Sequence, residues 1–311
     1  MFCRGCSWHH FPAILLLLLS GCNGSAPIPG SISARSVPDG NRCEQIDAIG
    51  RRVTLPRHPD RIVSLAPSVT EVLYLLGISD RLIGVTTHCD WPEDARQKPK
   101  IGDLLNPDAE LILAARPDLI IASTAGNDRS AVLKLAGLGL PVFVTAPRSV
   151  ATILETVEQI GRITDSEDRG QALAAAMKQR LDALDRRLAG VPMTRLFYIT
   201  WFEPLLAPGQ GTFENDLLRH AGAESITSGI AEFYPRYSLE QLIAQDPDVV
   251  VAARHEGAPL PDLKSLSGWG RLRAVREGRV YLVSQLLQHP SPRFVDALED
   301  LARRLHPERF R

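Results

Sequence analysis

A histidine, a cysteine and an aspartate stand side by side at positions 88 to 90, and these side-chain types could act as a nucleophile with its general base. Adjacent residues on an extended loop point to opposite sides of the chain, so His88, Cys89 and Asp90 do not form a triad through proximity in sequence. The sequence also has no Gly-x-Ser-x-Gly elbow, no His-Glu-x-x-His pair and no glycine-rich phosphate loop. We therefore expect no catalytic residue and no enzymatic activity.

Aromatic side chains gather in loops that are expected to follow strands: Trp91, Trp201, Phe202, Phe233, Tyr234 and Tyr237. Rigid rings suit a large, flat ligand such as a corrin or a porphyrin. Histidine and tyrosine are ordinary axial ligands of haem iron, and four of them stand in these loops: His88, Tyr234, Tyr237 and His289. Three arginines could pair with ligand carboxylates: Arg236, Arg254 and Arg293. The loops therefore predict a site for a bulky organic ligand, and they hold too few His, Asp and Glu to predict a metal site.

The first 21 residues have the pattern of a secretory signal. Arg4 precedes seven consecutive aliphatic residues, Ala13 to Leu19, and two small residues lead into Cys22. This run is too short to span about 30 Å of hydrocarbon, which takes ~20 apolar residues. Leu19-Ser20-Gly21-Cys22 resembles the lipobox of bacterial lipoproteins, so we expect Cys22 to carry lipid and to anchor the mature chain outside the cytoplasm. Residues 22–42 are rich in Gly, Ser and Pro and predict a flexible tether.

The charge balance excludes one class of partner. The 311-residue chain has 35 Lys+Arg and 36 Asp+Glu, and loss of the signal removes Arg4 but no acid. The mature chain is therefore slightly acidic, and it lacks the excess of basic residues that is typical of proteins that bind nucleic acid. About 290 residues remain, enough for one large or two modest domains.

Strands and helices are predicted to alternate in two halves of the chain. In the first half, after a hairpin at 44–55, we expect strands at 61–66, 82–86, 119–123 and 142–145 and helices at 69–76, 108–115 and 129–138. In the second half we expect strands at 196–200, 249–253 and 280–284 and helices at 213–220, 238–245 and 292–306. Apolar strands separated by amphipathic helices indicate mostly parallel sheets covered on both faces. The halves predict an N-terminal α/β lobe over 43–148 and a C-terminal α/β lobe over 191–311.

Residues 149–190 break this alternation. Apolar residues recur at intervals of three and four from Ile153 to Leu188, which predicts a long helix or two helices end to end, with Gly161 and Gly170 as the weak points.

The segment 110–122 (ELILAARPDLIIA) is echoed at 240–252 (EQLIAQDPDVVVA). Each copy has a helix end, Pro-Asp and then a buried strand at the same spacing. One copy in each half favours two related lobes.

Several short motifs in a fixed order carry a resemblance to a known family: Arg61–Gly77, Asp90–Pro92, Arg116–Leu119, Gly126-Asn127, Ser238–Gln241 and Ser291–Phe294. From about residue 43 to residue 310, the chain resembles the periplasmic substrate-binding proteins of ABC importers for cobalamin, iron-siderophores and haem, and most of all the cobalamin-binding members. The resemblance implies two Rossmann-like α/β lobes with mostly parallel central sheets. One long rigid α-helix over 149–190 would join them, and the ligand would lie in the cleft between the lobes.

The same resemblance implies a function. We expect a monomeric receptor without a cofactor that delivers a corrinoid to an ABC permease and its ATPase. Haem and a ferric siderophore are alternative ligands, and a metal-ion receptor or an enzyme on this fold is a more distant alternative.

The family's docking positions fall on two glutamates of this chain. In the family, one glutamate from each lobe docks onto arginines of the permease, and here these are Glu71 and Glu240. From spacing alone, Glu71 could instead complete a helix capping box with Ser68, and Glu240 could interact favourably with a helix dipole.

The expected ligand contacts are Pro67, Ser68, Trp91, Leu104, Trp201, Phe202, Tyr234, Tyr237 and His289. Trp201 and Tyr234 stand where the cobalamin-binding members have cleft aromatics. Those members have tryptophans at about the positions of Leu104, Ser123 and Leu286 or Leu287, so this chain departs from them there.

Cys43 and Cys89 remain once the signal and Cys22 are set aside. An oxidising compartment allows them to form a disulfide, and the alternative is two unrelated thiols. Their spacing to each other and to His88 is not a zinc pattern.

Overall fold

The computed structural model describes residues 41–254 and 260–311. The predicted signal sequence, Cys22 and most of the predicted tether lie outside these ranges. The described part begins with an antiparallel hairpin of β1 (Arg42–Ile46) and β2 (Arg52–Pro56), which confirms the predicted one. Its turn is held by the Asp47 carboxylate, which accepts from the backbone N–H of Arg51 at 2.9 Å and pairs with the Arg51 guanidinium at 2.6 Å.

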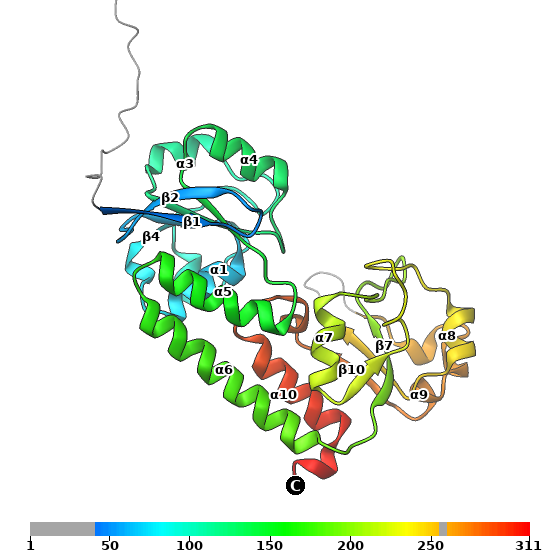
Figure 1. Cartoon of the computed structure of the whole chain (residues 1–311). Coiled ribbons are helices and arrows are strands. Elements are labelled where there is room, and N and C mark those ends of the chain that lie inside the picture. Colours follow the sequence, from blue (N-terminus) through cyan, green and yellow to red (C-terminus); the bar gives the residue numbers. More distant parts are fainter. Residues whose placement is uncertain (1–40, 255–259) are drawn as a thin grey trace, which may run out of the picture. The chain divides into compact units, whose positions relative to one another are not determined.

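The first sheet is parallel, with the strand order β4-β3-β5-β6. Its strands are β3 (Ile62–Ser64), β4 (Leu82–Val85), β5 (Leu119–Ser123) and β6 (Val142–Thr145). Because side chains alternate along a strand, Leu119 and Ile121 pack toward α1 (Pro67–Leu75), whereas Ile120 and Ala122 pack toward α3 (Ala109–Ala115) and α4 (Arg129–Gly137). Figure 1 shows α1 on one side of the sheet and α3 and α4 on the other. This sheet is therefore covered on both faces, as predicted.

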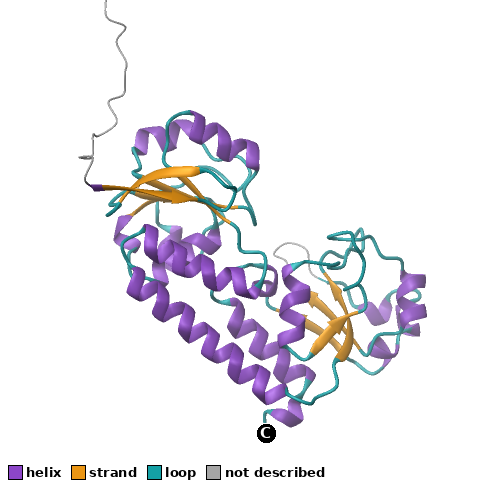
Figure 2. Cartoon of the chain, in the orientation of Figure 1, coloured by secondary structure: helices purple, strands orange, loops and turns teal. Residues whose placement is uncertain are grey.

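The second sheet repeats this plan, with four parallel strands in the order β10-β9-β7-β8. Figure 2 shows strands flanked by helices in both halves of the molecule. Its strands are β7 (Thr194–Ile199), β8 (Ala223–Ser225), β9 (Val249–Ala253) and β10 (Val280–Val283). Leu196 and Tyr198 pack with α7 (Phe213–His220) and α10 (Phe294–Leu305), whereas Phe197 and Ile199 pack with α8 (Leu239–Gln245) and α9 (Arg273–Arg276).

Most predicted strands and helices are confirmed to within a few residues; β5, β6, β9 and α7 have the predicted bounds. The sequence did not predict β8, α9 or α2 (Glu93–Arg96). Elements of three or four residues are too short to show a hydrophobic period.

An arginine closes the same helix-to-strand junction in both lobes. The guanidinium of Arg61, just before β3, donates to the carbonyl oxygen of Ala115 at 2.6 Å. The guanidinium of Arg195, on β7, donates to the carbonyl oxygen of Gln245 at 3.3 Å. Ala115 and Gln245 hold the same place in the repeated segment, so the sequence echo corresponds to a repeated local structure.

The connection between the lobes is helical, but the expectation of one long helix is wrong. Two helices, α5 (Val150–Ile163) and α6 (Glu167–Leu188), are separated by a turn in which Asp165 has the left-handed value φ 54°. The helices pack against each other rather than end to end, and a β-carbon built on Gly161 would lie 2.9 Å from the Cα of Gly170. The two glycines are therefore the point of closest approach of two helices, not weak points within one.

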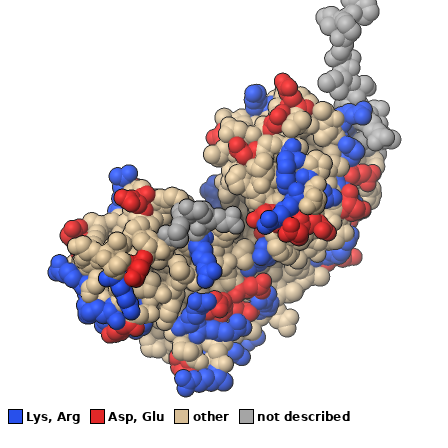
Figure 3. Space-filling model, turned by 180° about the vertical axis from the view of Figure 1, so that it is seen from behind, with Lys and Arg blue, Asp and Glu red and all other residues tan. Residues whose placement is uncertain are grey.

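The surface carries no single charge field on the side shown in Figure 3, where lysine and arginine side chains alternate with aspartate and glutamate. Within the described residues, no helix is both apolar enough and long enough to cross a bilayer.

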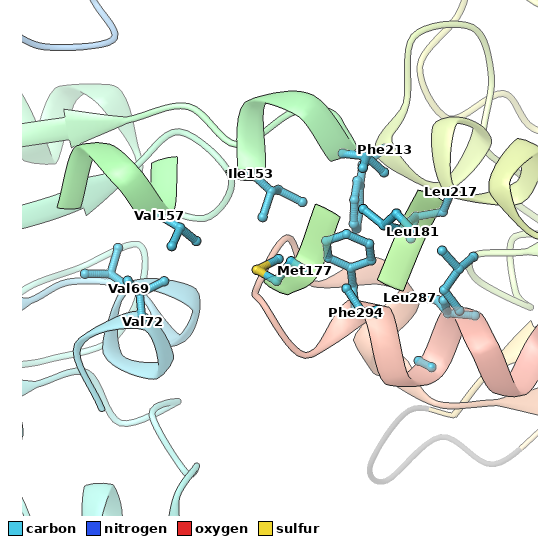
Figure 4. Packing of buried hydrophobic residues seen from close by; sticks show 14 of the residues in the cluster. Val69, Val72, Ile153, Val157, Met177, Leu181, Phe213, Leu217, Leu287 and Phe294 are labelled. Carbon is cyan, nitrogen blue, oxygen red and sulfur yellow. The ribbon is translucent and has the colours of Figure 1, made fainter. Parts of the chain in front are cut away.

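One hydrophobic core reaches from the first sheet to the second. Val69 of α1 and Val157 of α5 lie at one end of it, and Met177 of α6, Phe213 of α7 and Phe294 of α10 continue it (Figure 4). The rings of Phe213 and Phe294 meet edge to face, with centroids 5.7 Å apart. The helical connection is thus part of the core, which restricts its bending.

Candidate functional site

Four large apolar side chains stay exposed in loops that follow the strands of both sheets: Leu105 (58 %), Phe233 (57 %), Trp201 (42 %) and Tyr234 (42 %). Parallel strands end at a common edge, where sheets of this kind usually bind their ligands. Exposed apolar groups in such loops indicate a surface that binds another molecule.

Asn127 positions the loops of the first lobe. Its amide nitrogen donates to the carbonyl oxygens of Leu65 at 2.8 Å and Leu104 at 2.9 Å, and its amide oxygen accepts from the N–H of Ser123 at 2.8 Å. Leu104 is partly buried against the core, which leaves Leu105 as the exposed residue of this loop.

The aromatic loops of the second lobe are held by backbone and side-chain hydrogen bonds. The Trp201 indole N–H donates to the carbonyl oxygen of Glu203 at 2.8 Å, and residues 201, 206 and 236 are joined by bridge pairs. The Tyr234 hydroxyl donates to the two carboxylate oxygens of Glu214 at 3.3 and 3.4 Å. The ring of Phe233 meets that of Tyr234 at a centroid distance of 6.3 Å.

Two of the predicted ligand residues belong to the core of the second lobe instead. Phe202 lies with its ring centroid 5.7 Å from that of Trp269, and Tyr237 lies 5.3 Å from Phe197. Both are partly buried against the cluster beneath α8 and α9, so they pack within the lobe, and their contact with a ligand remains a prediction. The sequence could not separate them from Trp201 and Tyr234, because all four stand in the same loops.

Trp91 and Ser68 lie where the first lobe meets the segment before α10. The Arg293 guanidinium stands over the Trp91 ring, 4.4 Å from its centroid. Ser68 lines a void of about 10 Å³, just room for one water, with Pro290 and Pro292 among the other lining residues. These residues therefore contribute to a packed contact between segments far apart in sequence.

Pro67 is the first residue of α1, and His289 is exposed in the segment between β10 and α10. Neither position tests whether the residue contacts a ligand, so these two ligand contacts remain predictions.

Glu71 is 4 % exposed, so the prediction that it docks onto a permease is wrong. Its Oε1 lies 3.5 Å from the Arg293 guanidinium, and its Oε2 is buried without a hydrogen-bond partner. Burial raises the pKa of this carboxyl above its ordinary value, although Arg293 opposes the shift. The alternative capping box is wrong too, because Ala66 is the N-cap of α1 and no side chain caps it.

Glu240 is exposed, as docking requires. It is the second residue of α8, whose N-terminus is closed by a capping box between Ser238 and Gln241. Glu110 holds the same position on α3, where Asp108 is the N-cap, and it is exposed as well. The sequence repeat aligns Glu110 with Glu240, and the structure places the two glutamates at matching positions of their helices.

Glu214, which sequence reasoning missed, is a buried acid beside the exposed aromatic loops. It lies in the first turn of α7 and is 3 % exposed. Burial raises its pKa to about 7. The hydroxyl of Tyr198, on β7, is buried without a hydrogen-bond partner, and its pKa is raised by burial and then by the nearby Glu214.

The two cysteines are free thiols, so the prediction of a disulfide is wrong. Cys89 is buried, and its sulfur lies 3.1 Å from the Thr70 hydroxyl and 3.2 Å from the Thr86 hydroxyl. Burial raises the pKa of this thiol. Cys43 is half-buried on β1, opposite Leu55.

Among residues 41–254 and 260–311, no three His, Cys, Asp or Glu side chains are grouped so that they could hold a metal ion.

Comparison with known proteins agrees with this geometry. Residues 62–286 match the model of the family described as periplasmic binding protein. The chain is 29 % identical over 249 residues to the vitamin B12-binding protein of Vibrio parahaemolyticus, covering 79 % of this chain and 90 % of that protein. It is 27 % identical over 309 residues to YvrC of Bacillus subtilis, an uncharacterised ABC transporter substrate-binding lipoprotein, covering 96 % of this chain and 97 % of YvrC.

Among solved structures, the periplasmic heme-binding protein BhuT in complex with two hemes superposes with a TM-score of 0.72 at 27 % identity, covering 80 % of this chain and 98 % of BhuT. This likeness confirms the two-lobed α/β fold, and the resemblance to substrate-binding proteins of ABC importers is confirmed as well. The chain belongs to the periplasmic binding protein family and is a solute-binding protein rather than an enzyme.

Proposed function

We propose that this chain is a monomeric, extracytoplasmic binding protein, anchored by lipid on Cys22, that delivers a corrinoid of the vitamin B12 type to an ABC permease and its ATPase. One observation carries the proposal: Leu105 of the first lobe and Trp201, Phe233 and Tyr234 of the second stay exposed at the loop edges. A large, flat ligand would cover the three aromatic rings and the leucine side chain. The vitamin B12-binding relative supports this ligand class, and the name of YvrC supports the transporter class and the anchor.

Haem is the second candidate, because BhuT is seen with two hemes and His88 is exposed in the loop after β4. Tyr234 is poorly placed to serve as the iron ligand. Its hydroxyl donates to Glu214, and burial, together with the Glu214 charge, raises the pKa of this phenol. Iron binds tyrosine as the phenolate, so this environment favours a stacking role for Tyr234 over ligation.

The test is a binding experiment with three coloured ligands. The purified protein is mixed in turn with cyanocobalamin, haem and a ferric siderophore, and complexes are scored by absorption spectrum and intact mass. We expect a one-to-one complex with cyanocobalamin, weakened about tenfold or more by Trp201→Ala or Tyr234→Ala, since loss of a large ring contact removes a few kcal/mol.

The matched control is Met193→Ala, an exposed apolar residue directly before β7, at the opposite end of that strand. Met193→Ala should leave the affinity unchanged. Binding of haem alone would replace the corrinoid with the second candidate, and binding of none of the three would reject the proposal.

Glu110 and Glu240 are the glutamates that we propose for permease docking. They occupy the same position of the repeated helix, one in each lobe, and both are exposed. Two equal charges on related elements would fix the orientation of the protein on basic groups of the permease.

Charge reversal tests the docking proposal. The double variant Glu110→Lys/Glu240→Lys should abolish transport and leave ligand affinity unchanged, whereas Glu155→Lys, on an exposed acid of α5, should leave both transport and ligand affinity unchanged. Full transport by the double variant would reject docking through these residues.

A further inference from the structure

Glu214 is a buried acid, and no Lys, Arg or His of residues 41–254 and 260–311 forms an ion pair with its carboxylate. In the part of the chain that the structure describes, Tyr234 is the only side chain that hydrogen-bonds its carboxylate, at 3.3 and 3.4 Å. A carboxylate taken out of water usually pairs with a base or loses its charge. Burial accordingly raises the pKa of Glu214 from 4.5 to about 7, so that both protonation states are populated near neutral pH.

The surroundings of Glu214 supply phenols rather than charges. The titratable groups that face it are Tyr234 and, on β7, Tyr198. The elements packed against α7 are α5, α6, α10, β8 and the turn Gln285–Gln288. Four charged groups on α7 and on these elements have other partners: Asp216 with the N–H of Val150, His220 with Asp185, Asp296 with Arg180, and Glu224 with Ser228.

Tyr234 connects this buried acid to the surface. Its side chain is 42 % exposed, while its hydroxyl reaches inward to Glu214. Whatever covers the ring of Tyr234 therefore removes the remaining water from the pair formed by its hydroxyl and the Glu214 carboxyl.

We propose that Glu214 is a positioning residue of the ligand site, which holds the Tyr234 ring in place and takes up a proton when the ligand binds. This inference rests on the proposed function, because it requires the ligand to lie on Tyr234. Removal of water disfavours an ionised carboxylate far more than a neutral acid, so ligand binding should increase the proton affinity of Glu214. By reciprocity, the protein with neutral Glu214 should bind the ligand more tightly.

The dissociation constant of cyanocobalamin, measured by calorimetry from about pH 6 to about pH 8.5, tests this coupling. We expect the wild-type Kd to rise several-fold over this range, with a limit of about tenfold per pH unit for one proton. Titration at about pH 7 in two buffers of different ionisation enthalpy should show a fraction of a proton taken up per ligand bound.

Glu214→Gln keeps an acceptor for the Tyr234 hydroxyl but cannot titrate, so its Kd should be independent of pH. The matched control, Glu232→Gln, changes an exposed carboxyl two residues from Tyr234 and should keep the wild-type profile. Should Glu214→Gln fold poorly, proton uptake by the wild-type protein decides the matter, because a purely structural role for Glu214 predicts none.

A Kd that is constant with pH, or the same pH dependence in Glu214→Gln, would overturn the inference and leave the proposed function standing. Absence of cyanocobalamin binding at every pH would overturn both.

Discussion

The contact between α5 and α6 predicts that Gly161→Ala destabilises the protein, although alanine is the better helix former. In a helix interior this exchange normally adds about 0.5–1 kcal/mol of stability. Here the new Cβ would stand 2.9 Å from the Cα of Gly170 and 3.0 Å from the carbonyl oxygen of Ser166, against an optimal carbon–carbon separation of about 3.5–4.0 Å. Both neighbours are backbone atoms, so the helices themselves must move apart.

Overpacking of this kind costs about 1–3 kcal/mol, which exceeds the gain in helix propensity. We therefore expect a net loss of about 1–2 kcal/mol in the free energy of unfolding, measured by urea denaturation. Gly137→Ala is the matched control, because a Cβ at that helical position meets no atom within 4 Å. It should be neutral or stabilising by up to about 1 kcal/mol.

A Gly161→Ala protein as stable as the wild type, with a normal Gly137→Ala control, would refute the claim that the contact between α5 and α6 requires glycine at position 161.

Three further predictions concern buried groups. Because the folded-state pKa of Glu214 lies above its ordinary value of 4.5, the free energy of unfolding should fall as the pH rises from about 4.5 to 7, by at most about 1.4 kcal/mol per pH unit. Glu214→Gln should reduce this pH dependence, measured by urea denaturation at several pH values. The same pH dependence in the wild type and the variant would contradict the raised pKa of Glu214. Arg293→Ala should lower the free energy of unfolding by about 2 kcal/mol at neutral pH, since it leaves Glu71 buried without its cation; a thermally unchanged variant would show that the pair is not needed. Native protein should react with a thiol reagent at Cys43 and leave Cys89 unmodified until the protein unfolds, and a mass lower by two hydrogen atoms in the absence of reductant would instead indicate a disulfide.

Local patterns were sufficient to predict most of the fold. The apolar runs of β5 and β9 and the periodic helix α7 each have a signal confined to their own residues, and all three appear with the predicted bounds. The turn between α5 and α6 has no such signal, because it depends on Asp165 in a left-handed conformation and on a glycine-to-glycine contact between helices.

The candidate site was harder to predict because it depends on contacts between distant segments. Glu71 has the sequence context of an exposed helix start, and nothing near it in the chain shows that Arg293 covers it. In the same way, Tyr237 and Tyr234 stand close together in the sequence but have different contacts. The ring of Tyr237 packs against Phe197, whereas the hydroxyl of Tyr234 donates to Glu214.

The shared interior described above has a consequence for how the molecule melts. Val69 of the first half and Phe294 of the second contribute to one hydrophobic core, so each half needs residues of the other to complete this core. Calorimetry should give one endotherm, and fragments made by cutting the gene near Gly190 should be insoluble when expressed separately. The last helix of the chain completes that core, so truncation before Phe294 should unfold residues at the opposite end of the sequence as well.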